Sequence, residues 1–162
     1  MTAPQVLDAT AGSRMMWFDP DDERVIFLDK RHEHHELCDG RSLVIAPDVQ
    51  ADFTDMPFSG ETFQVVVFDP PHLERVGDTS WTKAKYGALI PGWEDVIRSG
   101  FAECFRVLKS GGILIFKWSE VQIPISKILP LAGVKPLFGH RTGKSQGTHW
   151  VAFIKEDMPS ES

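Results

Sequence analysis

The fold is decided by one stretch, Thr62-Phe63-Gln64-Val65-Val66-Val67-Phe68, which leads directly into Asp69-Pro70-Pro71-His72. Its first part is the most apolar run in the chain, and its apolar residues do not alternate with polar ones. Such a run is typical of a strand in the middle of a parallel sheet, where both faces are covered. The stretch therefore predicts an α/β domain in which Asp69 lies at the carboxyl end of a central strand.

Other apolar runs earlier in the chain also end at an acidic residue. The acids that follow such runs are Asp8, Asp29, Asp52 and Asp69. Because the carboxyl ends of parallel strands meet at one edge of a sheet, we expect these side chains to line that edge. Taken singly, an aspartate after a strand is also a common turn residue. A row of carboxylates repels itself, however, unless a ligand rich in positive charge or hydrogen-bond donors lies across it.

The remainder of the chain alternates strand and helix patterns, as α/β domains do. Asp39-Gly40 predicts a hairpin turn, and Arg14–Phe18 predicts a single helical turn. The elements expected after the central strand are a helix at Trp93–Leu108, a strand at Ile113–Trp118, a weaker helix at Ile123–Ala132, and strands at Val134–Phe138 and His149–Lys155. We expect one domain over residues 1–155, followed by a polar, flexible tail at 156–162.

The composition limits the class of protein. The chain has 162 residues and a mass of 18.2 kDa, with 42% hydrophobic and 25% charged residues, which is typical of one soluble globular domain. No apolar run approaches the ~20 residues of a membrane helix, so no membrane partner is expected. The first residues lack the basic region of a signal peptide, and two cysteines, Cys38 and Cys104, are too few for a disulfide framework. These features predict a cytoplasmic protein.

Charge is distributed unevenly along the chain. Residues 1–69 hold 5 Lys and Arg against 14 Asp and Glu, a net charge of −9, whereas residues 70–150 hold 11 against 6, a net charge of +5. The pattern predicts an anionic and a cationic face, with scattered solvated charges as the alternative. An overall charge of −6 by itself argues against nucleic-acid binding. If the protein binds a nucleic acid, we expect the cationic part of the chain, residues 70–150, to make the contact.

The turn after the first strand, Ala9-Thr10-Ala11-Gly12-Ser13, helps to choose the ligand. A dinucleotide fingerprint uses three glycines to bring backbone amides to a pyrophosphate, and this turn offers only Gly12. A ligand without phosphate fits the acidic edge better. S-adenosylmethionine has a sulfonium, an ammonium, two ribose hydroxyls and an adenine amino group, and it carries no phosphate.

At this point the chain resembles the class I S-adenosylmethionine-dependent methyltransferases over nearly its whole length. The matching stretches are Val6–Ser13, Asp29, Ala51–Phe58, and Cys104–Gly112, which is similar to the family's "RVLKPGG" turn. The resemblance implies a three-layer Rossmann-like fold with a mostly parallel sheet and an antiparallel last strand. It also implies S-adenosylmethionine as cofactor, held by Asp8, Ala9, Ala11, Gly12, Asp29, Asp52, Phe53 and Asp69. In that family the acid matching Asp29 holds the ribose hydroxyls, and the pair matching Asp52 and Phe53 receives the adenine.

Asp69-Pro70-Pro71-His72 is similar to the Asp/Asn-Pro-Pro-aromatic motif of methyltransferases that act on exocyclic amino groups. An aromatic amine is a poor nucleophile because its lone pair is delocalised. A carboxylate on Asp69 and the carbonyl of Pro70, held in direction by proline geometry, would accept its two N–H bonds and free that lone pair. The residue matching His72 stacks on the base, but a histidine also titrates and could act as a base. The resemblance thus implies catalytic roles for Asp69, Pro70, Pro71 and His72, with a rigid strand-end turn as the alternative.

Cationic and aromatic residues follow the later strands, and this mixture suits phosphates and bases. The candidate acceptor-binding residues are Lys83, Lys85, Tyr86, Lys117, Trp118, Arg141 and Lys144. We therefore expect methyl transfer to an amino nitrogen of a base in RNA or in single-stranded or flipped DNA. The alternatives are a small-molecule or nucleoside acceptor, and a non-catalytic cofactor-binding subunit. We expect a monomer or homodimer and no metal site, because His32-Glu33-His34-His35 has no strong ligand set near it.

Overall fold

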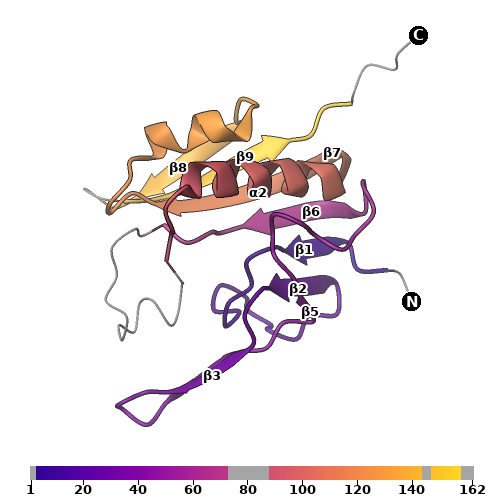
Figure 1. Ribbon diagram of the computed structural model, residues 1–162. Coiled ribbons are helices and arrows are strands. Elements are labelled where there is room, and N and C mark those ends of the chain that lie inside the picture. The colour runs from indigo at the N-terminus through magenta and orange to yellow at the C-terminus, as the bar shows by residue number, and fades with distance from the viewer. Residues whose placement is uncertain (1–2, 73–87, 144–146, 158–162) are drawn as a thin grey trace.

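A seven-stranded mixed sheet forms the centre of the computed structural model, which describes residues 3–72, 88–143 and 147–157 (Figure 1). The strands run in the order β5-β2-β1-β6-β7-β9-β8. They are β1 (Val6–Asp8), β2 (Val25–Asp29), β5 (Val49–Gln50), β6 (Phe63–Phe68), β7 (Leu108–Ser119), β8 (Phe138–Thr142) and β9 (Thr148–Ile154). From β5 to β7 all neighbours are parallel, whereas β9 is antiparallel to both β7 and β8. The predicted fold class is confirmed, and β6 lies between β1 and β7 at its centre.

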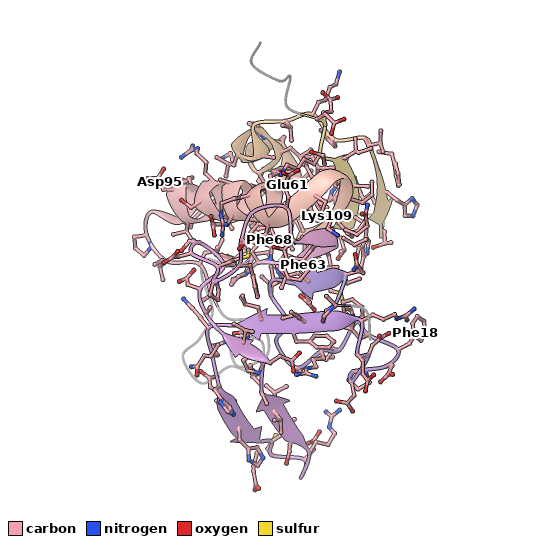
Figure 2. The ribbon with its side chains drawn as sticks, turned by 90° about the vertical axis from the view of Figure 1, so that its right-hand side faces the viewer. Phe18, Glu61, Phe63, Phe68, Asp95 and Lys109 are labelled. Carbon is pink, nitrogen blue, oxygen red and sulfur yellow. The ribbon has the colours of Figure 1, made fainter. Side chains whose placement is uncertain are left out.

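Helix α2 (Trp93–Val107) covers one face of the sheet and forms the main core with it (Figure 1). Leu7, Val66 and Leu114 lie side by side on neighbouring strands and are fully buried on this face. The ring of Phe68 meets that of Phe101 from α2 edge to face, with centroids 5.3 Å apart. Figure 2 shows Phe63 and Phe68 beneath the helix. This packing fixes the carboxyl end of β6, and therefore Asp69, relative to the sheet.

The opposite face of β1 and β2 is covered by the irregular segment 9–24. Trp17 packs edge to face on Phe27, with ring centroids 5.4 Å apart. The guanidinium of Arg14 lies over the same Phe27 ring, and it donates hydrogen bonds to the carbonyls of Pro20 (2.7 Å) and Ala46 (2.8 Å). This segment contains no helix in the structure, so the helical turn predicted at Arg14–Phe18 is wrong. Arg14 has a φ of 61°, which a helix does not allow.

A two-stranded hairpin, β3 (Glu33–Glu36) and β4 (Ser42–Ile45), lies apart from the large sheet (Figure 1). Its turn contains Gly40 with a φ of 85°, as Asp39-Gly40 predicted. The sequence His32–His35 belongs to this hairpin. His35 approaches Glu33 at 2.9 Å, and in the described part of the chain no group of acidic, histidine or cysteine side chains could hold a metal ion.

The second half of the fold departs from the prediction at its prolines and glycines. The helix expected at Ile123–Ala132 is two short 3-10 helices, η1 (Ile125–Lys127) and η2 (Leu129–Ala132), because Pro130 cannot donate the hydrogen bond that an α-helix requires. The strand predicted at Val134–Phe138 is also wrong. The chain around Pro136 forms no strand, and β8 (Phe138–Thr142) shares only Phe138 with the predicted strand.

Gly100 permits the close approach of α2 to β6. A Cβ atom added there would lie 2.6 Å from Cζ of Phe68, whose ring is itself enclosed by Phe101 and Phe116. Alanine favours a helix over glycine by about 1 kcal/mol, but overpacking costs about 1–3 kcal/mol. We therefore expect Gly100→Ala to lower the free energy of unfolding by up to about 2 kcal/mol, measured by denaturant unfolding. The matched control is Ser99→Ala, on the exposed side of the same helix, which should not destabilise the protein.

Candidate active site

A cavity of about 380 Å³ lies at the carboxyl edge of the parallel strands. Of the predicted cofactor residues, it is lined by Ala9, Ala11, Gly12, Asp29, Asp52, Phe53 and Asp69. Pro71 and Lys117 line its end near Asp69, and Leu89 and Trp93 close it from the α2 side. The structure thus brings three of the four predicted carboxylates to one cavity. Its size is within the range of small-molecule and cofactor sites.

Asp29 joins β2 to the turn after β1. Its Oδ2 accepts the N–H of Gly12 at 2.9 Å, and its Oδ1 accepts the backbone N–H of Arg31 at 2.9 Å. The side chain of Arg31 lies 3.3 Å from the same Oδ1. Because each carboxylate oxygen has two lone pairs, Asp29 keeps acceptor capacity toward the cavity that it lines. It is at the same time a structural residue for the glycine turn.

Asp52 and Phe53 lie beyond the end of β5 and differ in exposure. Asp52 is exposed, and its Oδ1 accepts the backbone N–H (2.9 Å) and the hydroxyl (2.8 Å) of Thr54. This arrangement leaves the second oxygen free of Thr54. Phe53 is half-buried and packs edge to face on Phe68, with centroids 5.0 Å apart. Together they present a carboxylate and an apolar ring at one end of the cavity.

Asp8 is buried behind the turn and is not among the residues that line the cavity. Its Oδ2 accepts the indole N–H of Trp17 at 2.7 Å, and its Oδ1 accepts the N–H of Thr10 at 3.1 Å. The pKa of Asp8 is raised to about 7, mainly by burial; the two hydrogen bonds oppose this rise, and the nearby carboxylates of Asp69 and Asp29 contribute to it. Asp8 therefore anchors the turn from behind, which differs from the direct cofactor contact that the sequence predicted.

Asp69 is held at two points. Its backbone N–H donates to Thr10 Oγ1 at 2.6 Å, and its Oδ2 lies 3.4 Å from the ammonium nitrogen of Lys117. Burial raises the pKa of Asp69, and the charge and hydrogen bond of Lys117 oppose that rise. The other carboxylate oxygen, Oδ1, is not engaged by Lys117. The tie between Thr10 and Asp69 also joins the turn after β1 to the tetrapeptide after β6.

The other residues of the tetrapeptide differ in exposure. Pro70 is buried, and Pro71 is half-buried and lines the cavity. His72 is half-buried, and its ring lies edge-on to that of Trp118, with centroids 6.2 Å apart. Burial, and then the charge of Lys117, lower the pKa of His72. The imidazole is therefore uncharged at neutral pH, a state in which it can stack or accept a proton.

The predicted acceptor-binding residues that the structure describes, Lys117, Trp118 and Arg141, do not form one group. Lys117 lies at the cavity, where it is paired with Asp69. Trp118 is fully buried and donates its indole N–H to the carbonyl of Ile123 at 2.9 Å, so it is a core residue and the predicted contact with an acceptor is wrong. Arg141 lies on β8, 3.9 Å from Glu120, and outside the cavity lining. Lys83, Lys85, Tyr86 and Lys144 lie outside the described residues.

Sequence reasoning missed the residues that support the carboxylates. Thr10 and Trp17 bond to Asp69 and Asp8, but a single hydroxyl and a single indole in a turn give no pattern that reveals such partners. Met15 and Ile90 were also missed. Both are 60% exposed and line the cavity, which gives its rim an apolar character.

Comparisons with known proteins agree on the fold. No family model and no curated protein matches the chain. Among solved structures it is similar to the PH0226 protein of Pyrococcus horikoshii OT3, with a TM-score of 0.60, 13% identity, and coverage of 93% of this chain and 81% of that one. It is also similar to the N-methyltransferase NodS of Bradyrhizobium japonicum WM9, with a TM-score of 0.55, 12% identity, and coverage of 94% and 84%.

A further similar structure is the 1,6-didemethyltoxoflavin-N1-methyltransferase of Burkholderia thailandensis, with bound 1,6-didemethyltoxoflavin and S-adenosylhomocysteine. Its TM-score is 0.55 at 14% identity, and the match covers 94% of this chain and 71% of that one. The fold is therefore that of the class I S-adenosylmethionine-dependent methyltransferases. None of the helices in the described part of the chain is long and apolar enough to cross a membrane.

The buried carboxyl of Asp8 predicts a pH dependence of stability. Its pKa is about 7 in the folded protein and 3.8 ordinarily, so between these values the folded protein keeps a proton that the unfolded chain releases. The free energy of unfolding therefore falls as pH rises through this window, with a slope that approaches about 1.4 kcal/mol per pH unit, and then levels off. Denaturant unfolding at several pH values should show that Asp8→Asn lacks this component of the slope.

The matched control is Asp52→Asn, which changes an exposed carboxyl at the same sheet edge. It should follow the wild-type pH dependence between about pH 4 and pH 7, because it leaves Asp8 and the hydrogen bonds of Asp8 unchanged. If wild type and Asp8→Asn keep a constant difference in stability across this range, Asp8 does not hold its proton as described.

Proposed function

We propose that this protein is an S-adenosylmethionine-dependent methyltransferase that transfers a methyl group to a nitrogen held at Asp69. The observation that carries the proposal is the position of Asp69. It lies at the end of a cavity whose other end presents Asp29, Asp52 and Phe53, in the positions where the fold's cofactor residues are expected. Cofactor and acceptor would thus meet at one carboxylate.

The residues present fit the cofactor. Asp29 offers acceptor lone pairs for ribose hydroxyls, and Asp52 offers one free carboxylate oxygen for an adenine amino group, beside the ring of Phe53. The turn around Gly12 would hold the methionine part. The similar Burkholderia structure contains S-adenosylhomocysteine, the demethylated product of this cofactor.

Asp69 and Pro70 would orient the acceptor. When bound, S-adenosylmethionine supplies an electrophilic methyl carbon on a sulfonium. The Oδ1 of Asp69, which Lys117 does not engage, and the carbonyl of Pro70 are the two acceptors that would receive N–H bonds and aim the nitrogen lone pair at that carbon. Bond formation from nitrogen to that carbon would break the carbon–sulfur bond, whose electron pair would leave with S-adenosylhomocysteine, and the extra proton on the nitrogen would pass to solvent. Positioning of this kind supplies a large part of a rate enhancement.

A small-molecule acceptor is favoured over a nucleic acid. Among the described candidate phosphate contacts, Lys117 is paired with Asp69 and Arg141 lies near Glu120, so neither presents an unpaired charge to a backbone phosphate. Two of the similar structures are methyltransferases that act on nitrogen by name, and one of them holds bound 1,6-didemethyltoxoflavin. A base amino group is the second candidate, because Asp69-Pro70-Pro71-His72 matches the motif of enzymes that act on such groups.

Binding of the cofactor can be tested directly. Calorimetry should detect S-adenosylmethionine and S-adenosylhomocysteine, and Asp29→Ala should weaken both by about 1–3 kcal/mol, because it removes a charged acceptor and the partner of the Gly12 turn. The control is Asp39→Ala, which removes an exposed aspartate on the hairpin that pairs with Arg41 outside the cavity. No heat with either ligand at millimolar concentration would remove the proposal.

Variants of Asp69 test whether the protein catalyses methyl transfer or only binds the cofactor. Transfer of labelled methyl groups should be measured with pools of small amines, nucleosides, RNA and DNA. Asp69→Ala should lower turnover by about 100-fold or more, the effect of losing one preorganised hydrogen-bond group, while cofactor affinity is retained. Asp69→Asn should lose less, because an amide oxygen still accepts one N–H bond. Wild-type turnover in Asp69→Ala would overturn the role of this residue, and labelling confined to RNA or DNA would favour the second candidate.

A further inference from the structure

The carboxylate of Asp69 is unusual for a group that would receive an amine, because its charge is already compensated. The ammonium nitrogen of Lys117 lies 3.4 Å from Oδ2, and both side chains are largely buried, with 26% of Lys117 and 16% of Asp69 exposed. The register of the sheet explains the pair. Val67 of β6 lies opposite Ile115 of β7 and Phe68 opposite Phe116, so the next residue along each strand brings Asp69 beside Lys117.

Lys117 is itself held in place. Its ammonium lies over the ring of Trp150 from β9, 5.4 Å from the ring centroid, and Lys117 and Trp150 are register partners in the antiparallel pair. The cation is thus fixed between a carboxylate on one neighbouring strand and an aromatic face on the other. A lysine fixed on two sides keeps its charge at one place in the site.

The electrostatic consequence concerns the charge of the acceptor. An uncompensated buried carboxylate would attract an alkylammonium ion, whose nitrogen has no lone pair for methyl transfer. With Lys117 beside it, the pair is neutral overall, and the lysine repels a second cation at the same position. An uncharged N–H donor is not repelled, and the free Oδ1 can still accept its hydrogen bond.

We propose that Lys117 is the specificity-determining residue of this site, which makes it accept nitrogens that are uncharged at neutral pH and reject alkylammonium ions. The acceptor class is then a heteroaryl amine or an N–H of a heteroaromatic ring. This inference rests on the proposed function, and it limits the class of acceptor to nitrogens without a positive charge. It applies equally to a free heterocycle and to a nucleobase, which share this chemistry.

Among the described residues, the other cations that line the cavity, Lys30 and Arg31, follow β2, and Arg31 lies 3.3 Å from Asp29. Asp8 on β1 lies behind Thr10 and is an acid, so it supplies no positive charge. His72 is uncharged at neutral pH because burial and Lys117 lower its pKa. Trp150 on β9 and the lining residues of α2, Trp93 and Val96, carry no charge. Lys117 is the cation beside Asp69 in the described part of the chain.

The test uses two probes of similar shape and different charge, aniline, which is neutral near pH 7.5, and benzylamine, which is cationic. Their dissociation constants for the protein saturated with S-adenosylhomocysteine are measured by NMR titration. The wild-type protein should bind aniline more tightly than benzylamine. Lys117→Met should change the ratio of the two dissociation constants in favour of benzylamine by about tenfold or more, as expected when one close like charge is removed. Lys117→Arg should keep the wild-type ratio. The matched control is Lys127→Met on η1, outside the cavity.

A second readout requires neither probe nor turnover. The Asp69 carboxyl carbon, identified by its loss in Asp69→Asn, is followed by NMR as pH is varied. It should titrate at higher pH in Lys117→Met than in wild type, and Lys117→Arg should restore the wild-type midpoint. An unchanged midpoint, an unchanged probe ratio, or a wild-type protein that binds neither probe overturns the inference. Loss of methyl transfer from every acceptor, with these readouts as expected, would instead count against the proposed function.

The acceptor's source is distinguished in the labelling experiment. Free heteroaryl amines and nucleosides that become labelled, with RNA and DNA unlabelled, support a small-molecule heterocycle. Labelled RNA or DNA with the methyl group on a base nitrogen supports a nucleobase, and the inference stands in either case. Efficient labelling of simple alkylamines by the wild-type protein would overturn it.

Discussion

The structure depends on one constraint, which is that carboxylates buried at the edge of a parallel sheet must each find donors on neighbouring segments. Unpaired, such groups would be protonated or would destabilise the fold. Asp8 is satisfied by Trp17 and Thr10, and Asp29 by Gly12 and Arg31. Each of these pairings ties a strand end to a loop. The cavity is therefore shaped by the same hydrogen bonds that satisfy the buried acids at its edge.

Thr10 has a central place in this set of contacts. Its N–H donates to Asp8 and its hydroxyl oxygen accepts the N–H of Asp69, so it links β1 to β6 directly above the sheet edge. The turn that would surround a cofactor and the tetrapeptide that would orient an acceptor are thus parts of one rigid unit. These hydrogen bonds hold the turn after β1 in place without a helix. The irregular segment 9–24 accordingly covers the face of β1 and β2 that lies opposite α2.

The sequence predicted the sheet well where buried runs were long, and less well where pairing with a distant segment decides the bounds of a strand. The run Phe63–Phe68 and the helix Trp93–Val107 were recognisable because their apolar patterns are strong. The start of β8 could not be predicted from Val134–Phe138, whose composition resembles a strand. It depends on pairing with β9, a contact with residues more than ten positions away. Long-range pairing of this kind leaves little trace in the local sequence.

For the site, the acids were predictable and their partners were not. A strand that ends in aspartate is visible in the sequence, but whether the side chain faces the cavity or the core depends on which donors lie nearby. Asp8 and Asp29 end adjacent strands in similar sequence settings, yet one is enclosed by Trp17 and the other opens onto the cavity. Trp118 was misassigned for a related reason, because alternation along β7 places it on the α2 side and Lys117 on the other.

That alternation also explains how one sheet can hold both a hydrophobic core and a charged site at the same level. Along β7, Phe116 and Trp118 point into the core beneath α2, while Lys117 between them points to the opposite face, beside Asp69 and Trp150. The period of two residues in a strand requires this separation. A lysine placed one residue earlier or later would be buried in the core without a partner. The chemistry of the site is therefore limited by the register of β6 and β7, which the packing of α2 on Phe68 holds in place.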